Sequence, residues 1–177
     1  MRETVLERSL LTRLKRGEPA ALGEVYERYA DDVYRMALRT TTSPADAYDV
    51  THDVFVGLPE AVGRYDPDRP FATWLRGVTV RIALMRMRSA RRRREASPVR
   101  LRHVGARSEV HAVIDRLTLE RAMDRLPTDL RIVFVLREVE GMSYADIAEL
   151  VGVTENLVAV RLHRARRTLR DLLGGER

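Results

Sequence analysis

The chain has 177 residues, of which 45% are apolar, and it contains no cysteine. This length holds one ordinary domain or two small ones, and the apolar content excludes a disordered chain. The lack of cysteine excludes a disulfide framework and a cysteine-based zinc site, and it fits a reducing cytoplasm. The chain has no run of about 18 apolar residues and no signal-peptide core at its start, so we expect a cytoplasmic protein without membrane insertion.

Positive charge is concentrated in the middle of the chain. The net charge of +6 divides into −3 over residues 1–60, +10 over residues 61–107 and −1 over residues 108–177. Apart from Lys15, every basic residue is arginine. A concentrated arginine block indicates a surface for an anionic polymer or a membrane, and a solvated linker is the alternative interpretation.

Apolar residues recur at helical spacing along almost the whole chain, and no segment shows sustained alternation, so an all-α fold is expected. A first helix ends at Gly17, and a second opens at Glu18-Pro19. Ser43 is a predicted N-cap for a third helix that runs to about Val62. After a loop over residues 63–70, a fourth helix starts at Phe71 and ends in the arginine run.

Residues 96–109 contain Pro, Gly and Ser and show no clean helical period, which predicts a flexible linker. Helical spacing resumes at about Val110 and stops near Pro127, and another helix starts at Thr128. The expected organisation is two small helical domains, residues 1–95 and 110–177, joined by this linker.

The segment "SYADIAELVGVTENLVAVRLHRARRTLR", residues 143–170, predicts two helices and a tight turn. Ser143 with Asp146 is a variant capping box, Gly152 suits the sharp turn, and Thr154 caps the second helix. One face of that helix is apolar, formed by Val158, Leu162, Ala165 and Leu169. The opposite face carries Asn156, Ala159, Val160, His163 and Arg167. The pattern indicates a DNA-binding helix-turn-helix, and an ordinary helical hairpin is the alternative.

Both halves resemble extracytoplasmic-function (ECF) sigma factors of the sigma-70 family. The segment "LPTDLRIVFVLREVEGMSYADIAELVGVTENLVAVRLHRARRTLR" is similar to the C-terminal domain, whose pattern is "GxSYxEIAxxxGxxxxTVxxRLxRAR". In the first half, "DAYDVTHDVF" stands for the family's "DAEDVVQEVF", and "FATWLRGVTVRIALMRMRSARRR" stands for "FxxWLxxIAxNxxxDxxRxxxR". The resemblance covers about residues 5–95 and 110–172, in the family's order.

The resemblance implies a protein that binds core RNA polymerase and gives it promoter specificity, with an anti-sigma factor as a further partner. The third helix is expected to dock on polymerase through Asp46, Asp49, Val50, His52, Asp53 and Val54. The loop and fourth helix are expected to serve the −10 element through Arg64, Tyr65, Phe71, Trp74, Arg76, Arg81, Arg86 and Arg88. The −35 element is expected to meet Tyr144, Thr154, Glu155, Asn156, Ala159, Val160, Arg161, His163, Arg164, Arg166 and Arg167.

The chain departs from the family pattern at several of these positions. Tyr48 and His52 replace Glu and Gln in the docking helix, and Arg81 replaces the usual Asn of the fourth helix. In the reading helix "LVAVR" replaces "TVKSR", which removes a hydroxyl and a lysine and leaves Ala159 and Val160 to meet a thymine methyl. The departures indicate an atypical promoter or weak binding to −35 DNA alone.

No catalytic set and no cofactor site emerge from the sequence, so we expect no enzyme activity. His52-Asp53 matches a metal-binding pair, but no second His–Asp cluster accompanies it. Two other functions stay open: a helix-turn-helix repressor without polymerase docking, and an interaction protein that occupies polymerase without using promoters. A repressor would need a ligand-binding or dimerisation domain in the first half, whereas this half carries the polymerase-docking pattern and the arginine-rich helix. Arg81 and the altered reading helix keep the interaction protein open.

Overall fold

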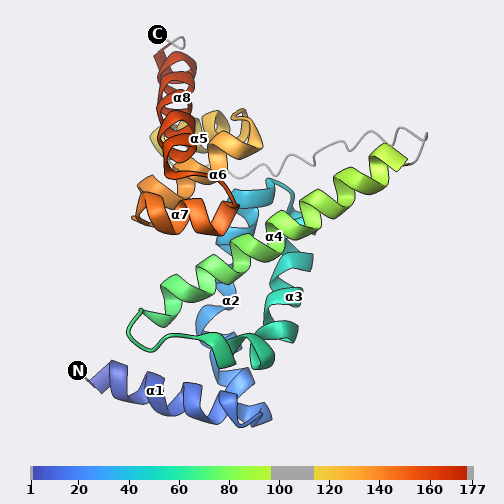
Figure 1. Cartoon of the computed structure of the whole chain (residues 1–177), viewed down its shortest axis with the longest axis vertical. Helices are drawn as coiled ribbons and strands as arrows, with labels where there is room; N and C mark the ends of the chain where they lie inside the picture. The colour runs from blue at the N-terminus through green and yellow to red at the C-terminus, as the bar shows by residue number, and fades with distance from the viewer. Residues whose placement is uncertain (1, 97–113, 175–177) are drawn as a thin grey trace. The chain divides into compact units, whose positions relative to one another are not determined.

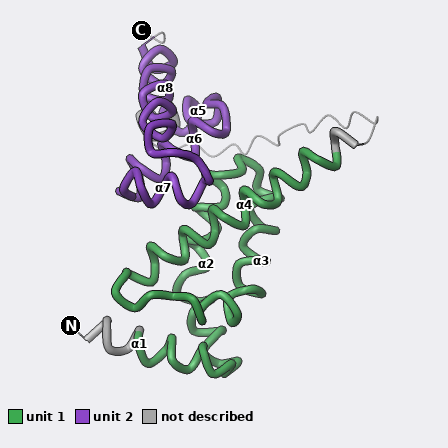
Figure 2. The backbone as a smooth tube through the Cα atoms, viewed as in Figure 1, with its two compact units in different colours: residues 1–93 green, residues 94–177 purple. Residues whose placement is uncertain are grey.

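A computed structural model describes residues 2–96 and 114–174 of the chain, and the side chains of residues 8–93 and 119–174. All regular structure in these ranges is helical, which confirms the all-α prediction (Figure 1). The backbone divides into two compact units, residues 1–93 and 94–177 (Figure 2). Beyond Ala96, the predicted linker and the start of the next helix at Val110 lie outside the described residues.

Unit 1 contains α1 (Arg2–Lys15), α2 (Pro19–Thr41), α3 (Pro44–Ala61), the short 3₁₀ helix η1 (Val62–Arg64) and α4 (Phe71–Ala96). The predicted breaks lie where expected. Gly17 has φ +75° between α1 and α2, a conformation that glycine adopts without strain. Ser43 caps α3, because its Oγ accepts the amide of Asp46 at 3.3 Å.

The core of unit 1 joins all four α-helices. Leu14, Val25, Val54 and Phe71 come from α1, α2, α3 and α4 and are at most 1% exposed. In Figure 1, α4 runs obliquely across α2 and α3, and ion pairs described below tie it to both. Burial of these apolar side chains is the main force that holds the helices together.

Unit 2 contains α5 (Ile114–Asp124), α6 (Thr128–Phe134), the π-helical turn η2 (Val135–Val139), α7 (Tyr144–Val151) and α8 (Glu155–Gly174). Val158, Leu162, Ala165 and Leu169 of α8 are buried, as predicted. They pack α8 against α5, α6 and α7. The sequence predicted one regular helix from Thr128, but its last turn widens into η2 before Gly141 ends it with φ +67°.

Candidate functional site

The outer side of α3 carries two rows of side chains. An acidic row contains Asp46, Asp49 and Asp53, and a second row, the Tyr–His–Val row, contains Tyr48, His52 and Val56 at spacings of four. Tyr48 is 72% exposed and Val56 is 65% exposed. An acidic row beside exposed apolar groups suits a partner with apolar and basic side chains.

Two residues predicted to dock face inward instead. Val50 and Val54 are 0% exposed and belong to the core of unit 1, so their side chains support α3 from beneath. Sequence reasoning missed Tyr48 and Val56 as the exposed apolar residues of this helix. Their spacing from His52 is the signal that could have found them, because residues four apart share a helix face.

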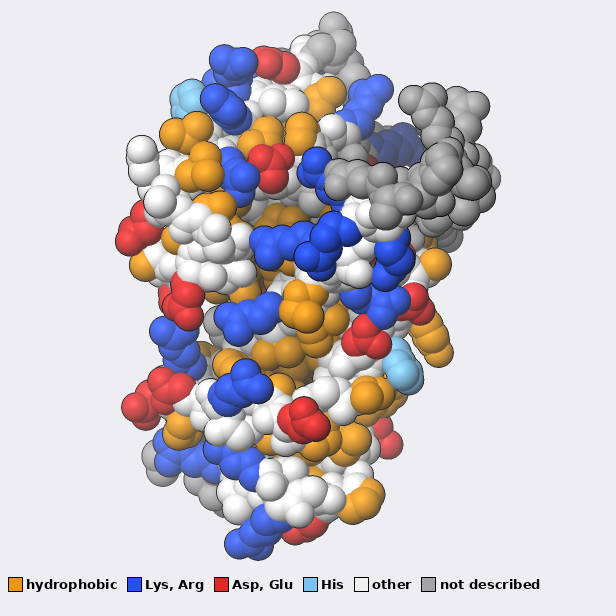
Figure 3. Space-filling view, turned by 45° about the vertical axis from the view of Figure 1, so that its right-hand side comes forward, with side chains coloured by type: hydrophobic (Ala, Val, Ile, Leu, Met, Phe, Trp, Pro, Cys, Tyr) orange, Lys and Arg blue, Asp and Glu red, His pale blue; other side chains and the backbone are white. Residues whose placement is uncertain are grey.

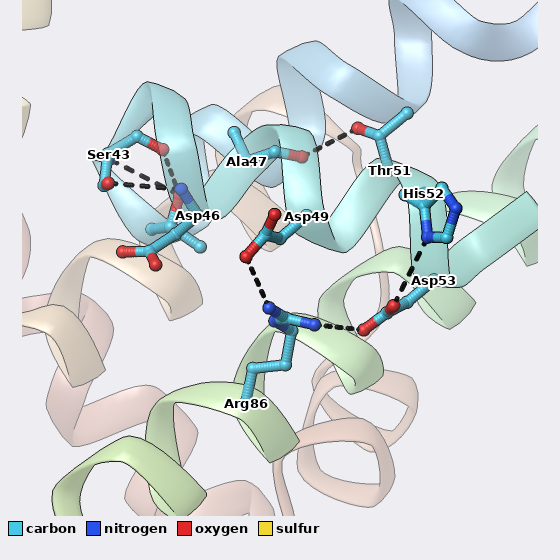
Figure 4. Close-up of polar contacts among 9 residues, drawn as sticks. Ser43, Asp46, Ala47, Asp49, Thr51, His52, Asp53 and Arg86 are labelled. Atoms are coloured by element: carbon cyan, nitrogen blue, oxygen red, sulfur yellow. Dashed lines mark hydrogen bonds and ion pairs between the residues drawn. The ribbon is translucent and has the colours of Figure 1, made fainter.

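Arg86 of α4 joins the acidic row of α3 (Figure 4). Its guanidinium donates to Oδ2 of Asp49 at 2.6 Å and also to Oδ2 of Asp53. The hydrogen bond to Asp53, followed by the charges of the nearby carboxylates, raises the pKa of Arg86, although burial opposes this shift. Arg86, predicted to serve the −10 element, therefore meets two carboxylates predicted to bind polymerase.

The other predicted arginines of this region differ in their surroundings. Arg64, at the end of η1, and Arg81 and Arg88, on α4, are exposed. Arg76 lies against α2, with its guanidinium 3.7 Å from Oδ2 of Asp32. Arg81 and Arg88 share one side of α4 with the exposed Arg92, and we call these three the arginine face.

The three aromatic residues predicted for the −10 region form one cluster. Phe71 is 1% exposed, and its ring lies 5.4 Å from that of Tyr65 and 5.5 Å from that of Trp74 between centroids. The hydroxyl of Tyr65 donates to the carbonyl of Arg69 at 2.6 Å. The cluster fixes the loop that precedes α4 to the core, and Phe71 presents no surface to a base.

The helix-turn-helix is built as its caps predict. Ser143 Oγ accepts the amide of Asp146 at 3.1 Å and donates to its carboxylate at 2.6 Å. Gly152 ends α7 with φ +74°, and Thr154 Oγ1 accepts the amide of Leu157 at 3.3 Å to open α8. These bonds satisfy amides that a helix start otherwise leaves without partners.

The exposed side of α8 carries most of the residues predicted to read the −35 element. We call Asn156, Val160, His163, Arg164 and Arg167 the reading face, and all five are exposed. Glu155 and Thr154 are exposed at the start of the helix, and Ala159 is half-buried beside the face. Leu157, which is not among the residues predicted to contact DNA, is also exposed.

Three other residues predicted to read the −35 element make contacts to other side chains of unit 2. Nε of Arg161 lies 3.2 Å from the Asp129 carboxylate of α6, and Arg166 donates to Glu138 of η2 at 2.5 Å. Tyr144 is half-buried beneath the Arg137 guanidinium, 5.1 Å from its ring centroid. Figure 3 shows one face of the molecule, on which basic side chains (blue) lie beside acidic side chains (red) in several places.

No group of three or more His, Cys, Asp or Glu side chains in the described ranges could hold a metal ion. His52 Nδ1 lies 3.8 Å from Oδ1 of Asp53, on the outer side of α3. Within the described ranges, none of the helices combines the length and the apolar character that a bilayer span needs.

Comparisons with known proteins match both units. The family described as Sigma-70 region 2 matches residues 25–93, and Sigma-70, region 4, matches residues 116–169. The ECF RNA polymerase sigma factor SigE of Mycolicibacterium smegmatis is 36% identical over 89% of this chain, which spans 64% of that protein. SigM of Mycobacterium tuberculosis is 30% identical over 89% of this chain and 80% of its own length. A structure of CnrH in complex with the cytosolic domain of CnrY is 28% identical, with a TM-score of 0.60 over 96% of this chain and 98% of that one.

Proposed function

The chain belongs to the extracytoplasmic-function RNA polymerase sigma factors of the sigma-70 family, and from that membership we propose how its two units divide the work. The protein directs transcription initiation by RNA polymerase and is not an enzyme. We assign polymerase docking and the −10 element to residues 1–95, and the −35 element to residues 110–177.

The outer side of α3 is the proposed polymerase-docking surface. Asp46, Asp49 and Asp53 supply charge for a basic partner, and His52 lies beside them. The single observation that carries this proposal is the exposure of Tyr48 and Val56 next to the acidic row. Large apolar side chains that are exposed beside charged groups are typical of a surface that a partner covers.

The arginine face of α4, with Arg64, is the proposed contact for the −10 region. Exposed guanidinium groups along one side of a helix suit the phosphates of a DNA strand. Tyr65, Phe71 and Trp74 act beneath them by holding the loop and the start of α4 in place.

The reading face of α8 is the proposed contact for the −35 element. Its N-terminal half offers an amide and small apolar groups that can meet base edges in the major groove. Arg164 and Arg167, further along the helix, suit phosphates. Arg161 and Arg166 contribute by fixing α8 to α6 and η2.

We also propose an anti-sigma factor as a partner and the cytoplasm as the place of action. Core RNA polymerase and promoter DNA are cytoplasmic in bacteria, so a protein that joins them works there. The support for a protein partner is that CnrH, a relative of the same fold, is bound to the cytosolic domain of another protein. Affinity capture of the full chain from its native cell tests this, and recovery of polymerase subunits alone contradicts it.

The docking proposal is tested with the double variant Tyr48→Ser with Val56→Ser. Both side chains are exposed, so the variant keeps the core of unit 1. We expect at least about a tenfold loss of affinity for core RNA polymerase, because burial of two large apolar groups contributes on the order of 1.5–3 kcal/mol each. Run-off transcription from promoter fragments falls with it.

Leu173→Ser is the matched control, because Leu173 is an exposed apolar residue near the end of α8. It should leave core affinity unchanged. A double variant that binds core polymerase as the wild type does would refute docking through the Tyr–His–Val row. Promoter binding by the wild type without any binding to core polymerase would instead favour the repressor interpretation.

A further inference from the structure

Arg86 lies on the packed side of α4. Thr79 and Ala83 are both 0% exposed, and Arg86 follows them at spacings of seven and three, which keeps all three on one side of the helix. At about 100° per residue, Arg81 and Arg88 fall on the opposite side. The direction of Arg86 is therefore set by the packing of α4 within unit 1, and it does not belong to the arginine face.

The guanidinium of Arg86 bridges two carboxylates of α3. It donates through Nη2 to Asp49 and through Nη1 to Asp53, and in each case the acceptor is Oδ2 (Figure 4). Oδ1 of Asp53 lies 3.8 Å from Nδ1 of His52, on the same outer side of α3. The side chains of Asp49 and Asp53 remain 55% and 42% exposed, so a second protein can reach them.

We propose that Arg86 is a positioning residue of the polymerase-docking surface and makes no promoter contact: it holds Asp49 and Asp53 at a fixed spacing for a basic group of core RNA polymerase. The inference rests on the proposed docking role of α3. A side chain that is already ordered loses less conformational entropy when a partner binds, so a pre-set pair of carboxylates binds more tightly than a free pair. The planar fork of arginine suits two acceptors at once, whereas the ammonium of lysine is a single point charge.

A role in DNA binding is the competing interpretation, and the same contacts argue against it. To reach a phosphate, Arg86 has to give up both carboxylates, and Asp49 and Asp53 then remain as neighbouring charges without their shared cation. The loss of two charge-assisted hydrogen bonds offsets the gain of a phosphate contact.

The test measures association and dissociation of the full-length protein with core RNA polymerase. We expect Arg86→Gln to bind about three- to tenfold more weakly, mainly through faster dissociation, because two carboxylates must then be ordered on binding. Arg86→Lys keeps the charge but should dissociate nearly as fast as Arg86→Gln. In the background Asp49→Asn with Asp53→Asn, the further change Arg86→Gln should have no effect, because Arg86 acts through those carboxylates.

Arg88→Gln is the matched control on the arginine face, and it should show the reverse pattern. It should lower the salt dependence of promoter binding by the holoenzyme by about one phosphate contact and leave dissociation from core polymerase unchanged. Circular dichroism checks that each variant folds. If Arg86→Gln does not fold, the dissociation rate of Arg86→Lys from core polymerase tests the inference instead.

Three outcomes overturn the inference in different ways. If the Asp49→Asn with Asp53→Asn variant dissociates faster but Arg86→Gln does not, Arg86 is no positioning residue and docking through α3 stands. If Arg86→Gln lowers the salt dependence of promoter binding by about one, Arg86 contacts a phosphate. If the acidic row can be neutralised without any change in core binding, the docking role of that row fails and the inference fails with it.

Discussion

Arg166 of α8 donates to Glu138 of η2 at 2.5 Å, so an arginine of the reading helix is bonded within its own unit. Arg164, two residues earlier, is exposed, and at about 100° per residue it lies on nearly the opposite side of the helix. We therefore expect the two arginines to have different tasks, although they stand in one basic run of the sequence.

Replacement of each arginine by alanine should separate these tasks. Arg164→Ala should weaken promoter binding about equally on all sequences and reduce the salt slope by about one. Arg166→Ala should change the slope less and lower the free energy of unfolding of unit 2 by at most about 1 kcal/mol, because the pair is exposed. Binding measured over a range of salt concentrations, with thermal unfolding of both variants, checks this. Equal slopes for the two variants contradict the division.

Asn156 is expected to read a base. Thr154 already caps α8 through the amide of Leu157, so Asn156 is available to pair with adenine. Asn156→Ala should cost about 1–3 kcal/mol at one position of the −35 element and relax the preference there. A promoter-library transcription assay measures this, with Thr154→Ala as the variant that loses the cap. Unchanged stringency with Asn156→Ala means that Asn156 does not read DNA.

Phe71 should affect folding before it affects promoter opening. Removal of a ring that is 1% exposed costs about 3–5 kcal/mol, so Phe71→Ala should unfold unit 1 at a much lower temperature. Tyr65→Phe keeps the ring and removes the hydroxyl bond to Arg69, so it should cost about 1 kcal/mol. Thermal unfolding followed by circular dichroism ranks the two. A Phe71→Ala protein of normal stability that cannot open promoters indicates direct contact with DNA.

Thr42 is a point of backbone strain. It follows α2 with φ +57°, where its amide donates to the carbonyl of Leu38 at 2.7 Å. A β-branched residue rarely adopts this left-handed conformation, and asparagine tolerates it better. Thr42→Asn should therefore stabilise unit 1 by about 0.5–1 kcal/mol in urea unfolding. Thr12→Asn, inside α1, is the control and should bring no gain.

Asp32 should make unit 1 sensitive to acid. The hydrogen bond from Arg35, at 2.6 Å, lowers the pKa of Asp32 below its ordinary value of 3.8; burial opposes the shift, and Arg76 adds to it. Folding therefore favours the ionised form, so this contribution to stability is complete above the ordinary pKa and is lost as the pH falls through the lowered one. Unfolding between about pH 5 and pH 2 should depend less on pH for Asp32→Asn. Asp31→Asn is the control, because it removes a neighbouring charge and keeps the bond to Arg35.

Local signals account for what the sequence predicted well. Ser43, Ser143 and Thr154 cap helices because each bond joins residues three apart, and Gly152 turns because its own backbone needs positive φ. The buried face of α8 also follows from spacing alone. Such features depend on a few neighbouring residues, so they can be predicted from the sequence before the fold is known.

Contacts between helices could not be predicted from the sequence. Arg86 meets Asp49 across 37 residues and Arg166 meets Glu138 across 28, and nothing in the charge pattern pairs them. The match to the family motif puts Val50 and Val54 on the docking surface, although their spacing of four is typical of a core face. The π-helical turn η2 was not predicted, because such turns are rare and occur mostly as single turns inside an α-helix.

The arginine face of α4 also sets a length. Arg81 and Arg92 are eleven residues apart, which on a straight helix is about 16 Å at 1.5 Å per residue. Along a duplex this equals the rise of about five base pairs, at 3.4 Å for each. In the proposed −10 contact the helix therefore fixes the spacing of the three Cα atoms, with Arg88 seven residues from Arg81 and four residues from Arg92.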